Sequence, residues 1–308
     1  MRYSRVADPD CSIAQALAVV GDWWTLLIVR DIAGGTHQFD ALRDALGISR
    51  KVLADRLAAL VGDGVLEKRL YHAHPPRHSY HLTRVGQGLL PVLVALQDWG
   101  GQYVMGDGTL SATSPADSAE TRRVHALVGA RVPETVLPAA PSGEPWDTPA
   151  ERDPVAGEPW TVLYCFPGAY APDVQGYPPG WGEIPGAAGC TLESCTYRDR
   201  LPEFEERGAR VYGVSTQRPD QLAAFAEHAG ITFPLLSDAD LRLTAALRLP
   251  TFRASGLDRL KRLTLLIDAE RTVRGVLYPV PDPAGSVGDA LALLDEVTAA
   301  DQRLPGPR

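Results

Sequence analysis

The sequence predicts two domains of different class, a small α+β domain in residues 1–105 and an α/β domain in residues 121–300. The chain has 308 residues, about twice the length of an average domain. Charge separates the two parts, because residues 1–105 hold 11 Lys or Arg and 10 Asp or Glu, whereas the whole chain carries a net charge of -8. Residues 106–120 are small and polar without apolar periodicity, which is typical of a flexible linker. Residues 301–308 are expected to form a tail.

The composition excludes several classes of protein. A sequence pI of about 5.4 excludes a uniformly basic nucleic-acid coat but allows a local DNA-binding surface. No apolar run approaches the roughly 20 residues of a membrane span, and the first ten residues show no signal-peptide pattern, so we expect a cytoplasmic protein with no membrane partner. Four cysteines do not make a secreted disulfide scaffold. The histidine spacing matches no compact zinc motif, and we expect neither a metal nor a cofactor.

The first domain opens with helices. Apolar residues recur at helical spacing from Ile13 to Val20 and continue from Trp24 to Ile28. A short helix with Phe39, Leu42 and Leu46 is stopped by glycine, and a serine can cap the helix that follows over residues 50–64. A short helix, a glycine-containing turn and a capped helix with basic residues in its first turn form a helix-turn-helix pattern.

A β-hairpin and a last helix complete this domain. Residues 64–71 and 78–83 read as two strands around a Pro75-Pro76 turn, with a basic, histidine-rich tip that would form a wing. The final helix, over residues 88–102, carries six large apolar side chains. The prediction is therefore a winged helix-turn-helix domain.

Residues 8–102 resemble the HxlR family of winged helix-turn-helix regulators. The resemblance rests on Cys11 with Ile13 and Leu17, and on the segments GDWWTLLIVRDI, FDALRDALGISRKVLADRLAALVGDGVLEKRLY and PPRHSYHLTRVGQGLLPVLVALQDWG. It implies a homodimer that pairs through its terminal helices and reads a near-palindromic operator in double-stranded DNA.

The resemblance also assigns candidate DNA-binding residues. Four would enter or flank the major groove: Ser49, Arg50, Lys51 and Arg56. Four would lie at the wing, near the backbone or minor groove: Arg69, His74, Arg77 and His78. Arginine can bond guanine with two hydrogen bonds, and lysine or serine can hold phosphates; the alternative is a solvated helix face and loop. Cys11 corresponds to a cysteine that some relatives use as a redox sensor, the alternative being a half-buried residue at a helix start.

The second domain alternates strands and helices. A buried strand ends at Pro167, and after a long loop the segment GCTLESC opens a helix. The order β-α-β-α followed by β-β-α predicts a mixed sheet with helices on both faces. An opening strand is expected at 127–133. The later elements are expected as a strand at 209–215, a helix at 219–229, a strand at 233–238, a helix at 241–247, a hairpin at 263–268 and 272–278, and a helix at 287–297.

This order resembles the thioredoxin fold, and in detail the peroxiredoxins of the bacterioferritin-comigratory, or PrxQ-like, group. The matching segments are GCTLESCTYRD at 189–199, VYGVST at 211–216, FAEHAGITFPLLSD at 225–238 and RLTLLID at 262–268. The resemblance implies a thioredoxin-like α/β domain of the AhpC/TSA type, a peroxide substrate and a thiol reductant.

Two cysteines carry the expected chemistry. Cys190 lies at a helix N-terminus, where unpaired N–H groups favour a thiolate, and a thiolate that attacks a peroxide becomes a sulfenic acid. Cys195 is the natural resolving thiol. Five residues of helix rise about 7.5 Å, whereas a disulfide needs Cα atoms within roughly 7 Å, so the first helical turn should unwind on oxidation. By the resemblance, Arg262 favours the thiolate and polarises the peroxide.

The sequence departs from the peroxiredoxin pattern in one respect. Ala187 stands three residues before Cys190, where the family carries a threonine whose hydroxyl orients the peroxide, and Thr191 is a candidate replacement. An alternative register after Pro167 places Ala171 at the threonine position and Val174 at the cysteine position, so that the reactive cysteine is lost. Cys165 is expected in the buried strand, with a third thiol at the site as the alternative.

Three functions remain open on the sequence alone. The first is a redox-responsive transcriptional regulator in which a Cys190–Cys195 disulfide changes DNA affinity. The second is a thiol-dependent peroxidase that uses a thioredoxin-like or low-molecular-weight thiol reductant. The third is a regulator whose inactive redox domain binds a ligand or partner.

Overall fold

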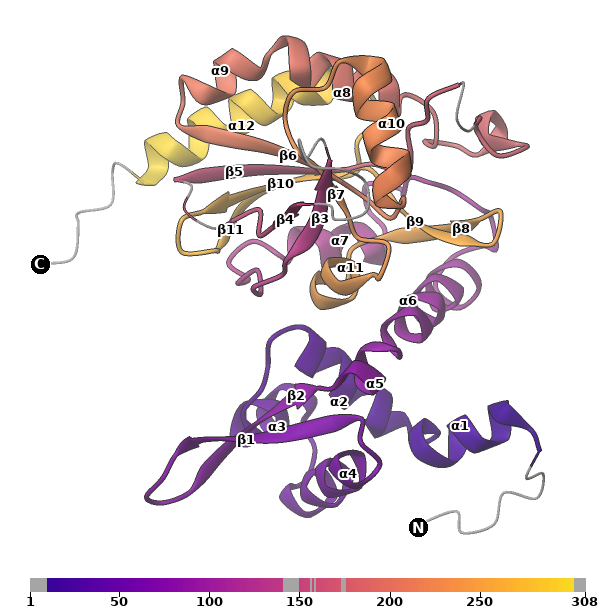
Figure 1. Ribbon diagram of the computed structural model, residues 1–308, viewed down its shortest axis with the longest axis vertical. Helices are drawn as coiled ribbons and strands as arrows, with labels where there is room; N and C mark the ends of the chain where they lie inside the picture. The colour runs from indigo at the N-terminus through magenta and orange to yellow at the C-terminus, as the bar shows by residue number, and fades with distance from the viewer. Residues whose placement is uncertain (1–9, 141–149, 156, 158, 173–175, 302–308) are drawn as a thin grey trace, which may run out of the picture. The chain divides into compact units, whose positions relative to one another are not determined.

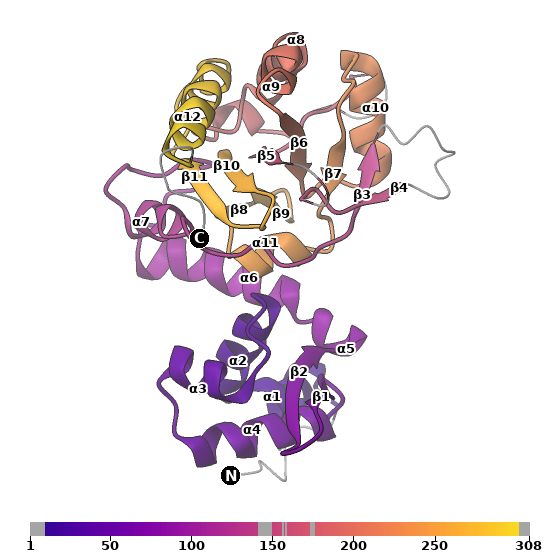
Figure 2. The ribbon, with the colours of Figure 1, turned by 90° about the vertical axis from the view of Figure 1, so that its left-hand side faces the viewer.

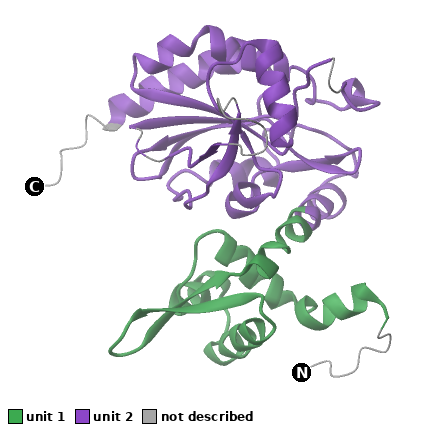
Figure 3. Cartoon of the chain, viewed as in Figure 1, with its two compact units in different colours: residues 1–94 green, residues 95–308 purple. Residues whose placement is uncertain are grey.

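The computed structural model describes residues 10–140, 150–155, 157, 159–172 and 176–301. The chain divides into two compact units, residues 1–94 and 95–308, which Figure 3 distinguishes by colour. The division falls earlier than the boundary expected after residue 105, because the second half of the last helix of the first domain packs with the second unit. The tail expected at 301–308 lies, apart from residue 301, outside the described residues.

Unit 1 is a helical domain with one hairpin, as the sequence predicted. Its core is formed by apolar side chains at helical spacing, including the fully buried Ile28, Leu42 and Leu53. The elements are α1 (Ser12–Val20), α2 (Trp23–Ala33), α3 (Phe39–Leu46), α4 (Arg50–Gly62), β1 (Leu66–His72), β2 (Arg77–Leu82) and α5 (Arg84–Gln87), and Figure 1 labels them.

Capping residues set the helix-turn-helix geometry. Gly47 ends α3 in the left-handed conformation, with φ of 62°, which glycine adopts at little cost. The hydroxyl of Ser49 accepts a hydrogen bond from the backbone N–H of Val52 at 3.3 Å and so caps α4. The antiparallel pair β1–β2 then forms the wing. The winged helix-turn-helix prediction is confirmed.

Unit 2 is built on a seven-stranded mixed sheet, with strand order β11-β10-β5-β6-β7-β3-β4. The neighbours β5, β6 and β7 are parallel, and β10 runs antiparallel to β5. The strands are β3 (Leu137–Ala140), β4 (Ala150–Arg152), β5 (Trp160–Cys165), β6 (Ala209–Ser215), β7 (Leu235–Ser237), β10 (Leu263–Asp268) and β11 (Val273–Leu277). A separate hairpin pairs β8 (Thr251–Ala254) with β9 (Leu257–Leu260).

Helices cover both faces of this sheet (Figures 1 and 2). On one face lie α8 (Cys190–Asp199), α9 (Leu201–Glu205), α10 (Pro219–Ala229) and α12 (Gly285–Asp301), and on the other lie α7 (Ala119–His125) and α11 (Arg242–Leu247). Because side chains alternate along a strand, Tyr164 enters the core under α8, whereas Leu163 and Cys165 enter the core on the other face. The predicted thioredoxin-like α/β fold is confirmed.

Several elements differ from the expectation, and α7 and β4 are among those for which no helix or strand was expected. The opening strand expected at 127–133 is a turn that makes a single bridge between Arg131 and Thr272. The hairpin β8–β9 was not predicted. Its strands have only four residues each, and so short a pattern is below the length at which alternation identifies a strand.

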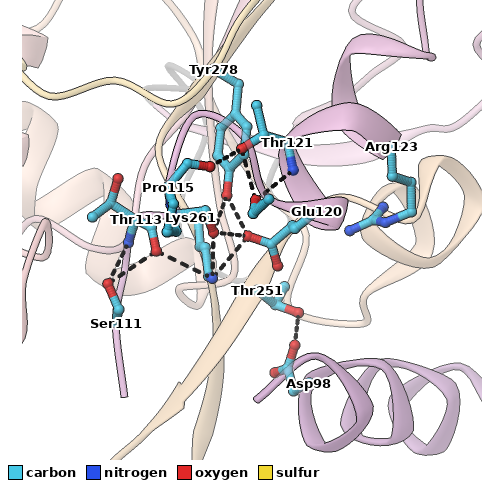
Figure 4. Close-up of polar contacts among 12 residues, drawn as sticks. Asp98, Ser111, Thr113, Pro115, Glu120, Thr121, Arg123, Thr251, Lys261 and Tyr278 are labelled. Atoms are coloured by element: carbon cyan, nitrogen blue, oxygen red, sulfur yellow. Dashed lines mark hydrogen bonds and ion pairs between the residues drawn. The ribbon is translucent and has the colours of Figure 1, made fainter. Parts of the chain in front are cut away.

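The segment 106–120 is hydrogen-bonded to the rest of unit 2, which differs from the flexible linker that its composition predicted. The backbone N–H of Ala112 donates to the carbonyl oxygen of Pro185 at 2.8 Å. The ammonium group of Lys261 lies 2.9 Å from a carboxylate oxygen of Glu120, and Figure 4 shows the two side chains together. The same ammonium group lies 3.2 Å from the hydroxyl of Ser114. A nearly buried lysine needs a carboxylate partner, and this long-range partner holds the segment in place.

The preceding helix, α6 (Leu90–Trp99), is anchored in the same region at its C-terminal half. The hydroxyl of Thr251 donates to the carboxylate of Asp98, and the side-chain amide of Gln97 donates to the carbonyl oxygen of Leu249 at 2.9 Å. Burial raises the pKa of Asp98 to about 7, against the effect of the Thr251 hydrogen bond.

The raised pKa of Asp98 predicts a pH-dependent contribution to the stability of unit 2. The folded state binds the proton more tightly than the unfolded state, so this contribution is present below about pH 4 and is lost as the pH rises to about 7. Between pH 5 and 7.5 we expect the free energy of unfolding to fall by about 1–2 kcal/mol more in the wild type than in Asp98→Asn. Urea denaturation of both proteins across this range measures the difference, and parallel pH curves would contradict it.

Among the described residues, no single helix is long and apolar enough to cross a membrane; α1 and α2 meet such a test only together, as a pair bent by 74°.

Candidate functional site

Cys190 is the first residue of α8, at the edge of the core beneath that helix. It follows Gly189, whose φ is 102° and whose hypothetical Cβ would lie 2.6 Å from Cγ of Pro283, so only glycine fits there. The sulfur is fully buried, and the thiol donates a weak hydrogen bond to the carbonyl oxygen of Ala187 at 3.5 Å.

The guanidinium of Arg262 contacts Cys190 and the groups around it. Nη2 of the guanidinium lies 3.1 Å from the sulfur of Cys190, and Nε donates to the carboxylate of Glu193 at 2.8 Å. The same side chain donates to the carbonyl oxygens of Gly186 and Ala188, at 2.9 and 3.2 Å. This contact supports the register that treats Cys190 as the reactive residue. Val174, from the alternative register, lies outside the described residues.

Burial and Arg262 act in opposite directions on the pKa of Cys190, in addition to the helix N-terminus that the sequence predicted. Burial raises the pKa of the Cys190 thiol; Arg262 opposes this effect, and the neighbouring carboxylate of Glu193 adds to it. Burial also raises the pKa of Glu193, although Arg262 pulls it down. The helix N-terminus alone therefore does not set the charge of the sulfur. The balance between desolvation and Arg262 does.

Cys195 lies on the same helix, α8, and is half-buried. Both cysteines are free thiols. Five helical positions separate them by about 7.5 Å along the axis, so a disulfide between them requires the first turn of α8 to open. Cys165 belongs to the core on the opposite face of the sheet from Cys190. The alternative that it is a third thiol of this site is therefore wrong.

Two hydroxyl groups, those of Thr191 and Tyr177, lie close together at the start of α8. Ala187 is fully buried and brings no hydroxyl. Thr191 is half-buried, and its hydroxyl lies 3.1 Å from the phenol oxygen of Tyr177. The Tyr177 ring contacts the rings of Tyr170 and Trp181. The sequence identifies Thr191 because this residue is next to Cys190. The position of the Tyr177 hydroxyl, in contrast, depends on how the long loop folds.

The four residues expected at the major groove have different environments in the structure. Arg50 and Lys51 are exposed in the first turn of α4, and the guanidinium of Arg50 lies 5.2 Å from the ring centre of Phe39. Ser49 is exposed but its hydroxyl also caps α4. Arg56, in contrast, makes a 2.7 Å ion pair with Asp22, the capping residue of α2. Arg56 is therefore engaged in the packing of helices in unit 1.

The wing residues lie on β1, on β2 and in the turn between them. Arg69 is exposed and pairs with Glu67. His74 and Arg77 are exposed at the tip, and His78 is half-buried opposite Leu70. These basic side chains lie on an exposed hairpin, which is the position expected of a wing that contacts a nucleic-acid backbone.

Cys11 precedes α1 at its N-cap position and is half-buried. Its side chain makes no capping hydrogen bond, while its carbonyl oxygen accepts from the backbone N–H of Gln15 at 3.0 Å. In the described part of the chain, no group of three or more His, Cys, Asp or Glu residues is arranged to hold a metal ion.

Comparison with known families and proteins matches the two halves separately. Residues 19–107 match the family model of the HxlR-like helix-turn-helix, and residues 184–276 match that of the AhpC/TSA family. An uncharacterized HTH-type transcriptional regulator of Mycobacterium tuberculosis is 41% identical over 93 residues, which are 30% of this chain and 59% of that protein. Peroxiredoxin Bcp of Escherichia coli is 34% identical over 91 residues, 29% of this chain and 58% of that protein.

Solved structures are similar to part of the chain as well. The crystal structure of peroxidoxin BcpB from Mycobacterium tuberculosis has 29% sequence identity and a TM-score of 0.44, and covers 55% of this chain and 96% of that chain. The chain thus spans less than two thirds of the length of the two sequence relatives it matches.

Proposed function

The chain joins an HxlR-like helix-turn-helix domain to a peroxiredoxin domain of the AhpC/TSA family, and from that premise we propose that it is a redox-responsive transcriptional regulator. One observation carries the proposal. Arg262, which contacts the reactive sulfur, directly follows Lys261, which pairs with Glu120 in the segment that leads from the first unit. Chemistry at Cys190 and the position of this segment are therefore linked through two consecutive residues.

The redox step begins with a peroxide. The thiolate of Cys190 attacks the terminal oxygen of the hydroperoxide, the O–O bond breaks, and the leaving alkoxide or hydroxide takes a proton to become an alcohol or water. The sulfur is thereby oxidised to a sulfenic acid. The thiol of Cys195 then attacks this sulfur, water leaves, and a disulfide forms. An outside thiol, either a thioredoxin-like protein or a low-molecular-weight thiol, reduces the disulfide again. This chemistry suits a reducing compartment such as the cytoplasm.

Oxidation would be transmitted by the opening of α8. Arg262 donates to Glu193 and to two carbonyl groups beside Cys190, so the unwinding of the first helical turn removes several of its acceptors. A shift of Arg262 displaces Lys261, and with it the Lys261–Glu120 ion pair. A coupling of about 1–3 kcal/mol, or roughly 5- to 150-fold in DNA affinity, is ordinary for such a switch.

The affinity for DNA in the two redox states tests the proposal. The probe is the duplex that the full-length protein selects from a random library, and its affinity is measured with reduced and with peroxide-treated protein. We expect a difference of at least about fivefold in the wild type and none in Cys190→Ser. Lys261→Met should keep the disulfide but reduce the difference. Equal affinity in both states of the wild type would overturn the regulatory proposal.

A thiol-dependent peroxidase is the second candidate function, because the contact between Cys190 and Arg262 and the presence of Cys195 on α8 are what catalysis by this route requires. Repeated peroxide turnover with a thiol reductant, at a DNA affinity that does not change, would favour this function. Absence of thiol chemistry together with ligand-dependent stabilisation would favour the third function, a binding protein.

DNA contact by α4 is tested by removing its exposed charges. We expect Arg50→Ala and Lys51→Ala each to weaken binding of the selected duplex by about 3- to 30-fold, and each lost phosphate contact to lower the salt slope by about one. Arg242→Ala, in unit 2, is the control, because Arg242 is an exposed arginine outside the helix-turn-helix. Fluorescence anisotropy at several salt concentrations gives both values. Equal losses in all three variants would contradict a specific role of α4.

A second copy of this chain is the proposed partner of unit 1. The apolar side chains of Ile13 and Leu17 on α1 are 70% and 56% exposed, and such exposure is typical of a helix that packs against another protein surface. We expect the wild type to sediment as a dimer and Leu17→Glu to shift toward monomer by at least about tenfold in dissociation constant. A monomeric wild type would contradict the dimer.

A further inference from the structure

Three buried cations lie close together in sequence where β9 meets β10, and one of them has no counter-charge among the residues that the structure describes. Arg259, Lys261 and Arg262 are 2%, 9% and 2% exposed. Lys261 pairs with Glu120, and Arg262 pairs with Glu193. Arg259 pairs with no carboxylate among the described residues, and its neighbour Asp258 is engaged by Arg253 at 2.6 Å. A buried charge without a partner costs several kcal/mol, so the position of Arg259 calls for a compensating group.

The surroundings of Arg259 compensate its charge only in part. Its guanidinium lies 4.9 Å from the ring centre of Trp181 and 6.0 Å from that of Tyr170, and Nη1 donates to the Tyr170 hydroxyl at 2.7 Å. Cation–π contacts of this kind are favourable. However, Nε of Arg259 and the indole Nε1 of Trp181 are both buried without a hydrogen-bond partner among the described residues. Both donors belong to neighbouring side chains and are available to one acceptor group.

This cluster lies close to the reactive sulfur. Nη1 of Arg259 lies 3.5 Å from the carbonyl oxygen of Pro167. A hypothetical Cβ on Gly168 would lie only 3.2 Å from the same Nη1 atom. The Tyr170 ring, whose hydroxyl accepts from Arg259, contacts the ring of Tyr177. The Tyr177 hydroxyl lies 3.1 Å from the hydroxyl of Thr191, the residue that follows Cys190. Contacts through Tyr170, Tyr177 and Thr191 therefore connect the guanidinium to the residue next to the thiol.

We propose that Arg259 is a specificity-determining residue that binds the carboxylate of an organic hydroperoxide while the peroxide group reacts at Cys190. This inference rests on the proposed redox function. The planar fork of arginine matches a carboxylate, and Trp181 supplies a further donor. The rings of Tyr170, Tyr177 and Trp181, which contact one another, give an aromatic surface for the organic part of the substrate. The product is the corresponding hydroxy acid.

The test compares an acid with its own neutral ester. The probes are 4-(2-hydroperoxypropan-2-yl)benzoic acid, its methyl ester, and hydrogen peroxide. Stopped-flow tryptophan fluorescence of the full-length protein gives the second-order rate constant of Cys190 oxidation for each. In the wild type the acid should react about 10- to 100-fold faster than the ester, the range expected for a hydrogen-bonded charge. In Arg259→Gln the ratio should fall to about one, and the rate with hydrogen peroxide measures how far the substitution affects Cys190 itself.

Two further variants keep the test decisive. Arg253→Gln lies on the same hairpin but removes an arginine that already has a carboxylate partner, so it should keep the wild-type ratio. Arg259→Lys retains the charge without the planar fork and should give an intermediate ratio, and it replaces Arg259→Gln if that variant does not fold. A ratio near one in the wild type, or an unchanged ratio in the folded Arg259 variant, would overturn the inference.

A binding measurement separates this inference from the redox proposal. If Cys190 reacts with no peroxide, the proposed redox function fails, and calorimetry with the unreactive 4-(2-hydroxypropan-2-yl)benzoate and its methyl ester still probes Arg259. Binding of the acid but not the ester, lost in Arg259→Gln, would support a carboxylate site. Binding of neither compound would overturn it.

Discussion

Cys190→Ser is expected to lose peroxide-dependent oxidation by at least about 1,000-fold, because a serine hydroxyl at neutral pH is a far weaker nucleophile than a thiolate. Cys195→Ser should react with peroxide at a similar rate but stop at the sulfenic acid, because the second thiol on α8 is missing. Mass spectrometry after one equivalent of hydrogen peroxide maps each thiol, and stopped-flow fluorescence gives the rate.

Cys165→Ser is the matched control for these two variants. Its thiol is buried on the other face of the sheet, and burial raises its pKa strongly, so its removal should leave the oxidation rate and the product unchanged. In the wild type, amide hydrogen exchange in the first turn of α8 should increase on oxidation, because a Cys190–Cys195 disulfide cannot form on an intact helix. A disulfide formed by Cys165, or unchanged protection of α8 in the disulfide form, would contradict this account.

Arg262→Gln is expected to slow oxidation of Cys190 by about 100-fold and to destabilise the second unit by about 2–4 kcal/mol. The rate falls because the guanidinium 3.1 Å from the sulfur favours the thiolate. The stability falls because Glu193, which is fully buried, loses the partner of its charge. Urea denaturation and the pH dependence of the oxidation rate measure the two effects.

The pH dependence distinguishes a role of Arg262 in the chemistry from a purely structural one. Oxidation requires the thiolate, so the rate rises with pH through the pKa of Cys190. Arg262 lowers this pKa and Glu193 raises it, so the rate profile should move to higher pH in Arg262→Gln and to lower pH in Glu193→Gln. The double variant should recover stability but not the rate. If the rate profiles of the wild type and of the two single variants coincide, Arg262 acts only through folding.

Local patterns predicted most elements of the fold. The α3–turn–α4 geometry follows from Gly47 and Ser49, which act on neighbours within a few residues, and the apolar spacing of α4 identifies its buried face. The same holds for β5, β6 and α10, whose apolar runs and flanking turns are visible in the sequence. The short hairpin β8–β9 could not be predicted, since four-residue strands carry too little periodicity.

The candidate site was predicted only in part. Cys190, Cys195 and Thr191 are close in sequence, so a single helix places them together. The role of Arg56 was not apparent, because its partner Asp22 lies on another helix and the pair forms only after the helices pack. The pKa of Cys190 likewise depends on contacts that local sequence patterns do not show. A helix terminus is a local feature, whereas burial depends on every element that covers the sulfur.

The sequence by itself determined that this chain has two domains, which families they resemble, and which two cysteines share one helix, since periodicity, capping and motif spacing act over short distances along the chain. Only the tertiary structure decided three other matters. It paired Lys261 with Glu120 across the segment that composition describes as flexible, placed Cys165 on the far face of the sheet, and left Arg259 without a carboxylate partner among the described residues. Ion pairing and burial depend on which distant residues meet, and that is settled only when the whole unit folds.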